Sequence, residues 1–180
     1  MTGIAGSECM VRAIANLNRP GWNLSAAEGF AVVLFRPVGL RELELVAASG
    51  WRVFPPRFVW QPIFYPVVTR EYARAIVTQW NSKESEAGHC GFVTEFDIDD
   101  EFVARYPVQQ LGGGPIYREL WVPAAELAEF NAHILGPIRV VESVYGSEYA
   151  AELDLASGLP VSVIRAGRQD AAPGTSSSDS

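Results

Sequence analysis

The amino-acid sequence predicts a compact α+β domain with a mixed or antiparallel sheet and about three short helices. Two observations lead to this fold class. The segments with strand patterns and those with helical periodicity are all short, and they lack the regular alternation that a doubly wound parallel sheet requires. The chain of 180 residues, with 48% hydrophobic and 19% charged residues, suits one domain with one core.

The first strand and helix signals lie close together. AVVLF (31–35) is a continuous apolar run typical of a buried strand, which we expect to end at Arg36. Apolar residues at helical spacing then begin at Leu40, and Gly50 is a natural C-terminal stop. The sequence therefore predicts a strand followed directly by a short helix.

The next strand pattern adjoins the clearest helix pattern of the chain. IFYPVV (63–68) is typical of a short strand, and Pro66 confines it to a sheet edge or a bulge. Thr69 is a suitable N-cap for the helix that follows. The apolar residues of that helix form one stripe from Ala73 to Trp80, which is the side expected to face the core.

Two strand patterns follow in the second half of the chain. GFVTEFDI (91–98) alternates between two faces, as a half-buried strand does. YRELWV (117–122) places Tyr117, Glu119 and Trp121 on one face of a strand. We therefore expect these three side chains to lie in the same environment.

The last elements are a helix and a strand. Pro123 is expected in the first turn of the helix, where proline is tolerated. IRVVESV (138–144) is expected to be the last core strand, and a weaker strand is expected at 161–165.

Composition divides the chain into three regions. Residues 1–28 are expected to be an N-terminal extension, loosely docked or disordered, because residues that break helices interrupt its one short helical pattern. Residues 29–165 form the single α+β domain. Residues 166–180 are small and polar, so burial cannot offset the entropy of ordering them, and a disordered tail is expected.

Charge and cysteine content limit the possible binding partners and the cellular compartment of the protein. The formal net charge of −7 repels phosphate backbones, so a nucleic-acid partner is disfavoured. No apolar run approaches the length of a membrane span, and no secretory signal is visible at the N-terminus. Two cysteines, Cys9 and Cys90, are too few for a disulfide scaffold. We therefore expect a cytoplasmic protein with reduced thiols and no membrane partner.

The strong motifs of phosphate, metal and hydrolase sites are absent from the sequence. It contains no GxxxxGK[ST], no HExxH and no CxxC pair. LGGGP (111–115) is better interpreted as a hinge than as a phosphate cradle. His89 and His133 have no metal-ligand spacing with the cysteines, so no metal site is expected.

Four residues remain as candidates for chemistry. Glu119 is a carboxylate flanked by aromatic residues, as a catalytic group can be. The simpler interpretation is that Glu119 faces outward without a task or pairs with an arginine. Arg36 follows an apolar strand, so its guanidinium could clamp a pyrophosphate or a carboxylate, or pair with an acid such as Glu119. Phe64 and Tyr65 are core residues by default, but a ring beside a cleft could stack on nicotinamide.

Much of the chain resembles small bacterial proteins labelled "ADP-ribosylation/crystallin J1". The resemblance covers about residues 35–141 and rests on four stretches, namely FRPVGLRELELVAASGWRVFPPR, QPIFYPVVTREYARAIVTQWN, GFVTEFDI and RELWVPAAELAEFNAHILGPIRVV. The ADP-ribosylglycohydrolases in that label are larger, all-helical proteins with an Asp-rich dimetal site, which this sequence does not match. The layout is closer to the ADP-ribosyltransferase fold, and it implies a split sheet of that type.

The resemblance to ADP-ribosyltransferases implies an NAD site and a reaction. Glu119, in a stretch similar to E-[VL]-x-[VI]-P, would stabilise the oxocarbenium-like ribose as the bond to nicotinamide breaks. Arg36 would grip NAD, and Tyr65 would stack on nicotinamide. Phe64 belongs to the aromatic strand of that fold, and Tyr72 to its Tyr-Ala helix pair. ADP-ribose would pass from NAD, the substrate, to an unknown acceptor.

The sequence also departs from that pattern and leaves alternatives open. A Ser-Thr-Ser element is missing, and Tyr117 stands where arginine-modifying transferases carry Glu or Gln. A non-catalytic binding or regulatory module on the same fold would show an ion pair between Arg36 and Glu119. Two further alternatives are another NAD-consuming activity and the hydrolysis of ADP-ribosyl groups. The transferase interpretation, in its strong form, expects Arg36, Tyr65 and Glu119 to line one cleft.

Overall fold

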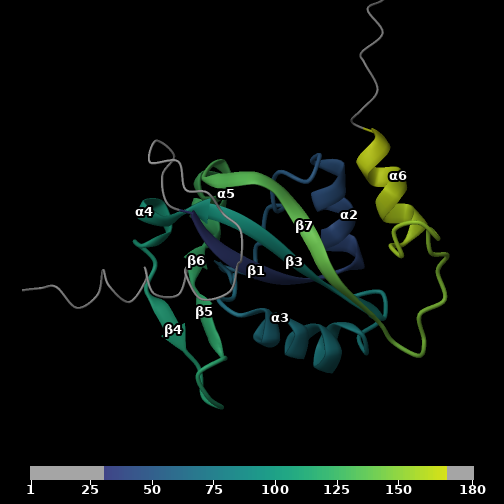
Figure 1. The fold of residues 1–180 in the computed structure, drawn as a ribbon, viewed down its shortest axis with the longest axis horizontal. Helices are drawn as coiled ribbons and strands as arrows, with labels where there is room; N and C mark the ends of the chain where they lie inside the picture. The colour runs from purple at the N-terminus through teal and green to yellow at the C-terminus, as the bar shows by residue number, and fades with distance from the viewer. Residues whose placement is uncertain (1–30, 170–180) are drawn as a thin grey trace, which may run out of the picture.

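The computed structural model describes residues 31–169, and its centre is a three-stranded antiparallel sheet (Figure 1). The strands lie in the order β1 (Ala31–Gly39), β3 (Cys90–Asp99) and β7 (Ile134–Tyr145). The predicted α+β class with antiparallel pairing is confirmed. The expectations for residues 1–28 and for residues 170–180 lie outside the described residues.

Two short two-stranded ladders lie outside the three-stranded sheet. β2 (Ile63–Phe64) pairs with β6 (Val122–Pro123), and β4 (Val108–Gln110) pairs with β5 (Arg118–Leu120), both antiparallel. Val67 connects β5 to the main sheet, because it bridges Phe35 of β1 on one side and Glu119 of β5 on the other.

The helices are short, and there are more of them than expected. The helix predicted at Leu40 is α2 (Leu40–Ala48), and the one after Thr69 is α3 (Arg70–Ile76). The later helices are α4 (Asp100–Val103), α5 (Leu127–Ala132), which a 3₁₀ turn precedes, and α6 (Val161–Gln169). None of the helices in the described range is long and apolar enough to cross a bilayer.

Two sequence-based assignments near the C-terminus were wrong. Residues 161–165 form the first part of α6 rather than a strand. The short valine–serine alternation there imitates a strand, but Val163 and Ala166, three residues apart, join the core as a helical stripe beside α2. The helix continues to Gln169, past the expected domain boundary at residue 165.

Strand β1 does not end at Arg36 but continues through Pro37 to Gly39. Phe35 exchanges backbone hydrogen bonds with Val67, on the side away from β3. Alternate residues of a strand direct their backbone groups to the same side, so Pro37, two residues later, also turns its missing N–H away from β3. Proline is therefore tolerated at this position.

Pro123 likewise lies in a strand rather than a helix. It pairs with Ile63 in the β2–β6 ladder, and helical structure begins only at Ala124. The backbone N–H of Ala124 donates to Pro62 O at 2.8 Å, which fixes the end of the ladder.

The cap of α3 is confirmed, but the apolar stripe of that helix is only partly buried. Thr69 Oγ1 accepts a hydrogen bond from the backbone N–H of Tyr72 at 3.3 Å. From Val77 to Asn81 the helix widens into a π-helical turn, which shifts the side-chain positions away from the 3.6-residue period. As a result Trp80 is 51% exposed instead of facing the core.

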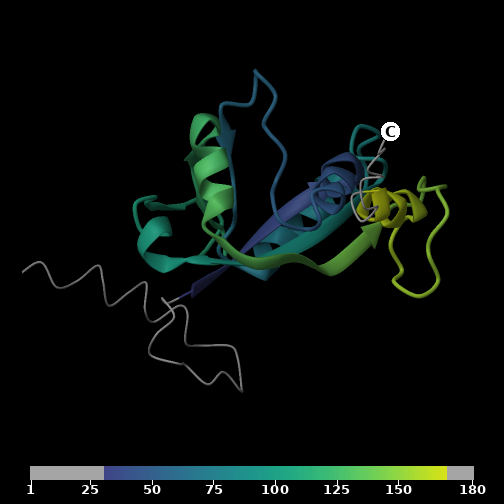
Figure 2. The ribbon, with the colours of Figure 1, turned by 90° about the horizontal axis from the view of Figure 1, so that it is seen from above.

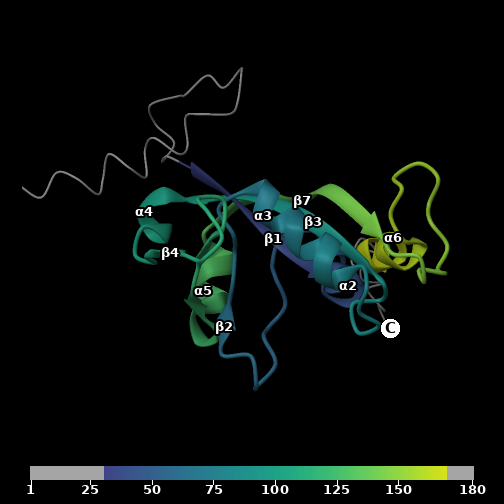
Figure 3. The ribbon, with the colours of Figure 1, turned by 90° about the horizontal axis from the view of Figure 1, so that it is seen from below.

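The two faces of the sheet bury separate clusters. The larger cluster contains Phe54, Phe64, Phe96 and Phe130, whose rings meet at centroid distances between 5.1 and 6.1 Å. Helices α2 and α6 lie together at one end of the sheet, and α5 at the other (Figure 2). The opposite face is covered by α3 (Figure 3). It buries the smaller cluster, which consists of Val67, Ala73, Val77 and Val93.

A glycine permits the close approach of the π-helical turn to β3. A Cβ atom on Gly91 would lie 2.7 Å from the Cβ atoms of both Val77 and Asn81. We expect Gly91→Ala to lower the free energy of unfolding by about 1–3 kcal/mol through this overpacking. Chemical denaturation measures the effect, and Gly112→Ala is the matched control because its Cβ would meet no atom within 4 Å. Equal stability of the two variants would contradict the prediction.

Candidate functional site

Glu119 is a buried carboxylate on β5, in the two-stranded β4–β5 ladder. It is 8% exposed, and its neighbours Leu120 and Val122 both belong to the large core cluster. Because successive side chains of a strand point to opposite faces, Glu119 and Trp121 project together to the other face. The predicted common face of these two residues is therefore confirmed.

Two neutral donors hold the Glu119 carboxylate. Trp121 Nε1 donates to Oε1 at 2.7 Å, and Tyr72 Oη donates to Oε2 at 3.2 Å. Burial, followed by the charge of Glu119, raises the pKa of Tyr72 to about 12, so this phenol remains a donor at neutral pH. Each carboxylate oxygen is thus fixed by one hydrogen bond and keeps further acceptor capacity.

Aromatic rings surround this carboxylate. The ring of Tyr65 meets Trp121 edge to face at 6.4 Å, and Tyr72 meets Tyr117 at 5.2 Å. Tyr65 is 39% exposed and Trp121 is 48% exposed, so both rings are accessible to solvent. The Glu119 carboxylate beside them is buried. We call Glu119, Tyr65, Tyr72, Tyr117 and Trp121 the Glu119 site.

Arg36 lies on the opposite face of the sheet. Its strand neighbours Leu34 and Val38 belong to the large core cluster, and its guanidinium lies 4.7 Å above the ring of Phe64. Nε and Nη2 donate to the two oxygens of Glu42 at 3.0 and 3.2 Å. In the part of the chain that the structure describes, Arg36 therefore pairs with Glu42 and not with Glu119.

The structure thus brings together only some of the predicted site residues. Tyr65, Tyr72 and Glu119 share one face, whereas Phe64 is fully buried in the core and the Arg36 guanidinium lies over its ring. One contact crosses between the faces, because Arg36 Nη1 donates to the backbone oxygen of Tyr65 at 3.0 Å. Arg36 and Glu119 do not face one common cleft, so the transferase interpretation in its strong form, which expected Arg36, Tyr65 and Glu119 to line one cleft, is wrong. The contact of Arg36 with NAD stays a prediction.

A second arginine, which sequence reasoning missed, shares the Glu42 carboxylate. Arg57 Nη1 lies 3.4 Å from Glu42 Oε2, so two guanidinium groups contact one carboxylate and leave a surplus positive charge. Burial, and then the charge of Arg36, lowers the pKa of Arg57. The Nε atom of Arg57 is buried without a hydrogen-bond partner. The only signal in the sequence is the adjacent Pro55–Pro56 pair, which stiffens the segment.

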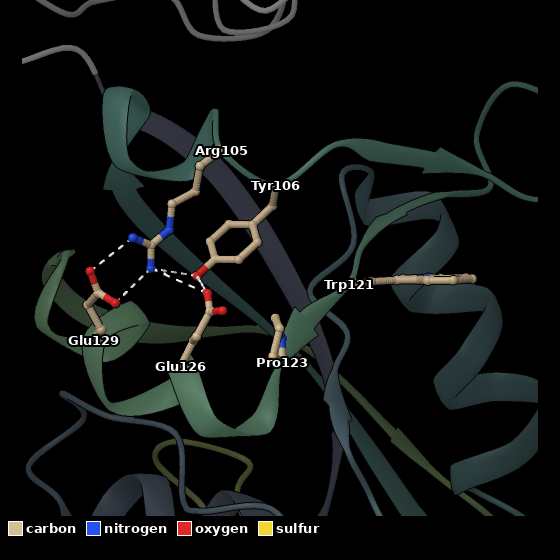
Figure 4. Close-up of a pocket in the computed structure, with 6 residues that line it drawn as sticks. All are labelled: Arg105, Tyr106, Trp121, Pro123, Glu126 and Glu129. Atoms are coloured by element: carbon tan, nitrogen blue, oxygen red, sulfur yellow. Dashed lines mark hydrogen bonds and ion pairs between the residues drawn. The ribbon is translucent and has the colours of Figure 1, made fainter.

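An open pocket of 560 Å³ lies beside the Glu119 site (Figure 4). Trp121 belongs to both, since its indole N–H contacts Glu119 and the residue is also part of the pocket lining. The complete lining is Arg105, Tyr106, Trp121, Pro123, Glu126 and Glu129. We call this cavity the Trp121 pocket. Apart from Trp121 and Pro123, sequence patterns gave no sign of it.

Neither the glycine-rich stretch nor a histidine is part of the lining of the Trp121 pocket. LGGGP connects β4 to β5, and Gln110 Nε2 closes the turn by donating to Gly114 O at 2.6 Å. Between residues 31 and 169, no group of three or more His, Cys, Asp or Glu side chains is arranged to hold a metal ion.

Comparisons with known proteins yield no match. No protein-family model matches the chain, and neither a curated protein nor a solved structure does.

The raised pKa of Tyr72 predicts a pH dependence of stability. The folded state holds this proton up to about pH 12, whereas the unfolded chain releases it near pH 10. The unfolded state therefore binds fewer protons in that interval, and the free energy of unfolding falls as pH rises through it. Tyr72→Phe should make this fall shallower, as measured by denaturant titration at a series of pH values. Glu119→Gln should do so in part, and curves parallel to the wild type would contradict both expectations.

Proposed function

We propose that this protein binds NAD, cleaves the bond between nicotinamide and ribose, and transfers ADP-ribose to an acceptor. The observation that carries the proposal is the Glu119 carboxylate, which is buried, held by two hydrogen bonds and adjoined by two accessible aromatic rings. The resemblance to the ADP-ribosyltransferase fold supports the same function.

A fixed, buried carboxylate suits this reaction. Positive charge develops on the ribose ring as the glycosidic bond breaks, and a nearby carboxylate stabilises that charge. The effect is larger in a water-poor site than in bulk water. Tyr72 and Trp121 hold Glu119 in place before the reaction, so little reorganisation is needed when the charge appears.

The accessible rings and the paired arginines suit the rest of the NAD molecule. Tyr65 and Trp121 offer faces on which a planar nicotinamide can stack. The surplus positive charge on Arg36 and Arg57 favours an anion such as pyrophosphate. In this proposal Arg57 contacts the pyrophosphate, while Arg36 holds the Tyr65 backbone in place.

The structure gives no specific support to the alternative of a non-catalytic module. That interpretation expected Arg36 to neutralise Glu119. Among the described residues, the partners of Glu119 are instead the neutral donors Tyr72 and Trp121. The carboxylate therefore keeps its negative charge uncompensated by an arginine.

Replacement of the carboxylate tests the proposal. We expect the wild type to bind NAD and release nicotinamide, and Glu119→Gln to bind NAD with release reduced at least about 100-fold. Calorimetry measures binding, and chromatography measures nicotinamide. Glu71→Gln is the matched control, since Glu71 lies on an exposed turn of α3 and the same charge is removed. No binding of NAD by the wild type, or equal release by both variants, would refute the proposal.

A second prediction concerns the paired arginines. Arg57→Gln should weaken NAD binding about tenfold, because a charge-assisted hydrogen bond to phosphate is lost. Binding of nicotinamide riboside, which lacks the pyrophosphate, should change little. Arg41→Gln removes the same charge from an exposed position of α2 and serves as control. A similar loss for both ligands would instead indicate a general disturbance of the segment.

A further inference from the structure

Three consecutive apolar side chains are exposed in the loop between α2 and β2. Phe58 is 60% exposed, Val59 is 99% exposed and Trp60 is 75% exposed. The rings of Phe58 and Trp60 stack in parallel, with their centroids 4.9 Å apart and their planes 3° apart. The backbone N–H of Gln61 donates to Phe58 O at 2.8 Å, so the three residues form one tight turn. We call Phe58, Val59 and Trp60 the aromatic turn.

The loop that carries the aromatic turn projects from the body of the molecule, as both Figure 2 and Figure 3 show. Both ends of the loop are fixed. Before the turn, Asn131 Nδ2 donates to Phe54 O and the N–H of Phe54 donates to Asn131 Oδ1, each at 2.9 Å. After the turn, the N–H of Ala124 donates to Pro62 O at 2.8 Å. Exposed apolar side chains that are gathered and held in this way mark an interaction site.

The loop differs in charge from the rest of this acidic chain. Between Glu44 and Glu71 the sequence contains three arginines but no Asp or Glu. Arg52 is exposed, and Arg57 directly precedes the turn. Carboxylates of the loop's own segment therefore do not repel a surface that bears phosphate groups. The formal net charge of −7 nevertheless disfavours a surface that is itself anionic, which leaves an electrically neutral one.

The shape of the aromatic turn favours a lipid surface over a protein partner. A specific protein interface covers about 800 Å² on each partner, which is more than the side chains of one turn supply. A lipid surface requires neither a minimum area nor a complementary groove. Tryptophan and phenylalanine rings partition into the region between the head groups and the acyl chains.

A contact with a lipid surface requires no membrane-spanning segment. It is therefore compatible with the finding that no helix among the described residues is long and apolar enough to cross a bilayer. The expectation of no membrane partner, drawn from the sequence, considered only spanning segments and a secretory signal.

We propose that the aromatic turn inserts into the surface of an electrically neutral lipid bilayer and attaches the protein there. Three apolar side chains give a weak and reversible attachment. The proposal does not depend on the proposed function, because the aromatic turn shares no residue with the Glu119 site. Lipid binding and NAD cleavage can therefore be tested, and can fail, independently.

Sedimentation of the full chain with sucrose-loaded phosphatidylcholine vesicles tests the proposal. We expect the wild type to sediment with the vesicles at millimolar lipid. The double variant Phe58→Ser/Trp60→Ser should partition at least about tenfold more weakly, because the burial of two aromatic rings is lost. Trp80→Ser is the matched control, since it removes an indole that is 51% exposed from the π-helical turn after α3. Added salt should change the partitioning little, because the lipid surface is neutral.

Fluorescence quenching by lipids with brominated acyl chains identifies the inserted ring. Only an indole that enters the bilayer surface meets the bromine atoms. We expect quenching in the wild type and its loss in Trp60→Phe. This variant retains an apolar ring and should still sediment with the vesicles.

Several outcomes would overturn the inference. These are no sedimentation of the wild type at millimolar lipid, equal weakening in Trp80→Ser and in the double variant, or quenching that persists in Trp60→Phe. Analytical ultracentrifugation without lipid adds a fourth: a dimer of the wild type that the double variant dissociates would show that the turn joins two copies of the chain instead.

Discussion

The backbone bridge at Val67 is the constraint on which the rest of the site depends. Val67 exchanges hydrogen bonds with Phe35 at 2.9 and 2.7 Å, and the strand that carries Glu119 is paired on its other side. Paired positions of antiparallel strands share a face. The row that runs from Gln109 through Glu119, Val67 and Phe35 to Glu95 therefore determines which face the Glu119 carboxylate joins.

The same alternation separates groups that the sequence places close together. Arg36 is one residue from Phe35, yet its guanidinium lies on the opposite face, over the ring of Phe64. A slip of one residue in the strand pairing would exchange the two faces. The register of the strands therefore decides which side chains belong to the Glu119 site. Tyr65 connects the faces, because its carbonyl accepts from Arg36 and its ring contacts Trp121.

Charge is distributed unevenly along this part of the molecule, although the chain as a whole is acidic. Arg36 and Arg57 share the Glu42 carboxylate, whereas the partners of Glu119 among the described residues are neutral donors. Under the proposed function, the paired arginines would attract the pyrophosphate of NAD, and Glu119 would stabilise the positive charge that develops on the ribose. Such local imbalance, rather than net charge, decides which ligand a site attracts.

The sequence by itself determined the α+β class, the cap at Thr69 and the common face of Glu119 and Trp121. These features depend on local periodicity and on hydrogen bonds between residues close in the chain. The tertiary structure alone decided that Arg36 pairs with Glu42, that Arg57 joins them and that residues 161–169 form a helix. The choice of partner and the burial of a short segment depend on contacts between distant parts of the chain, which local patterns do not record.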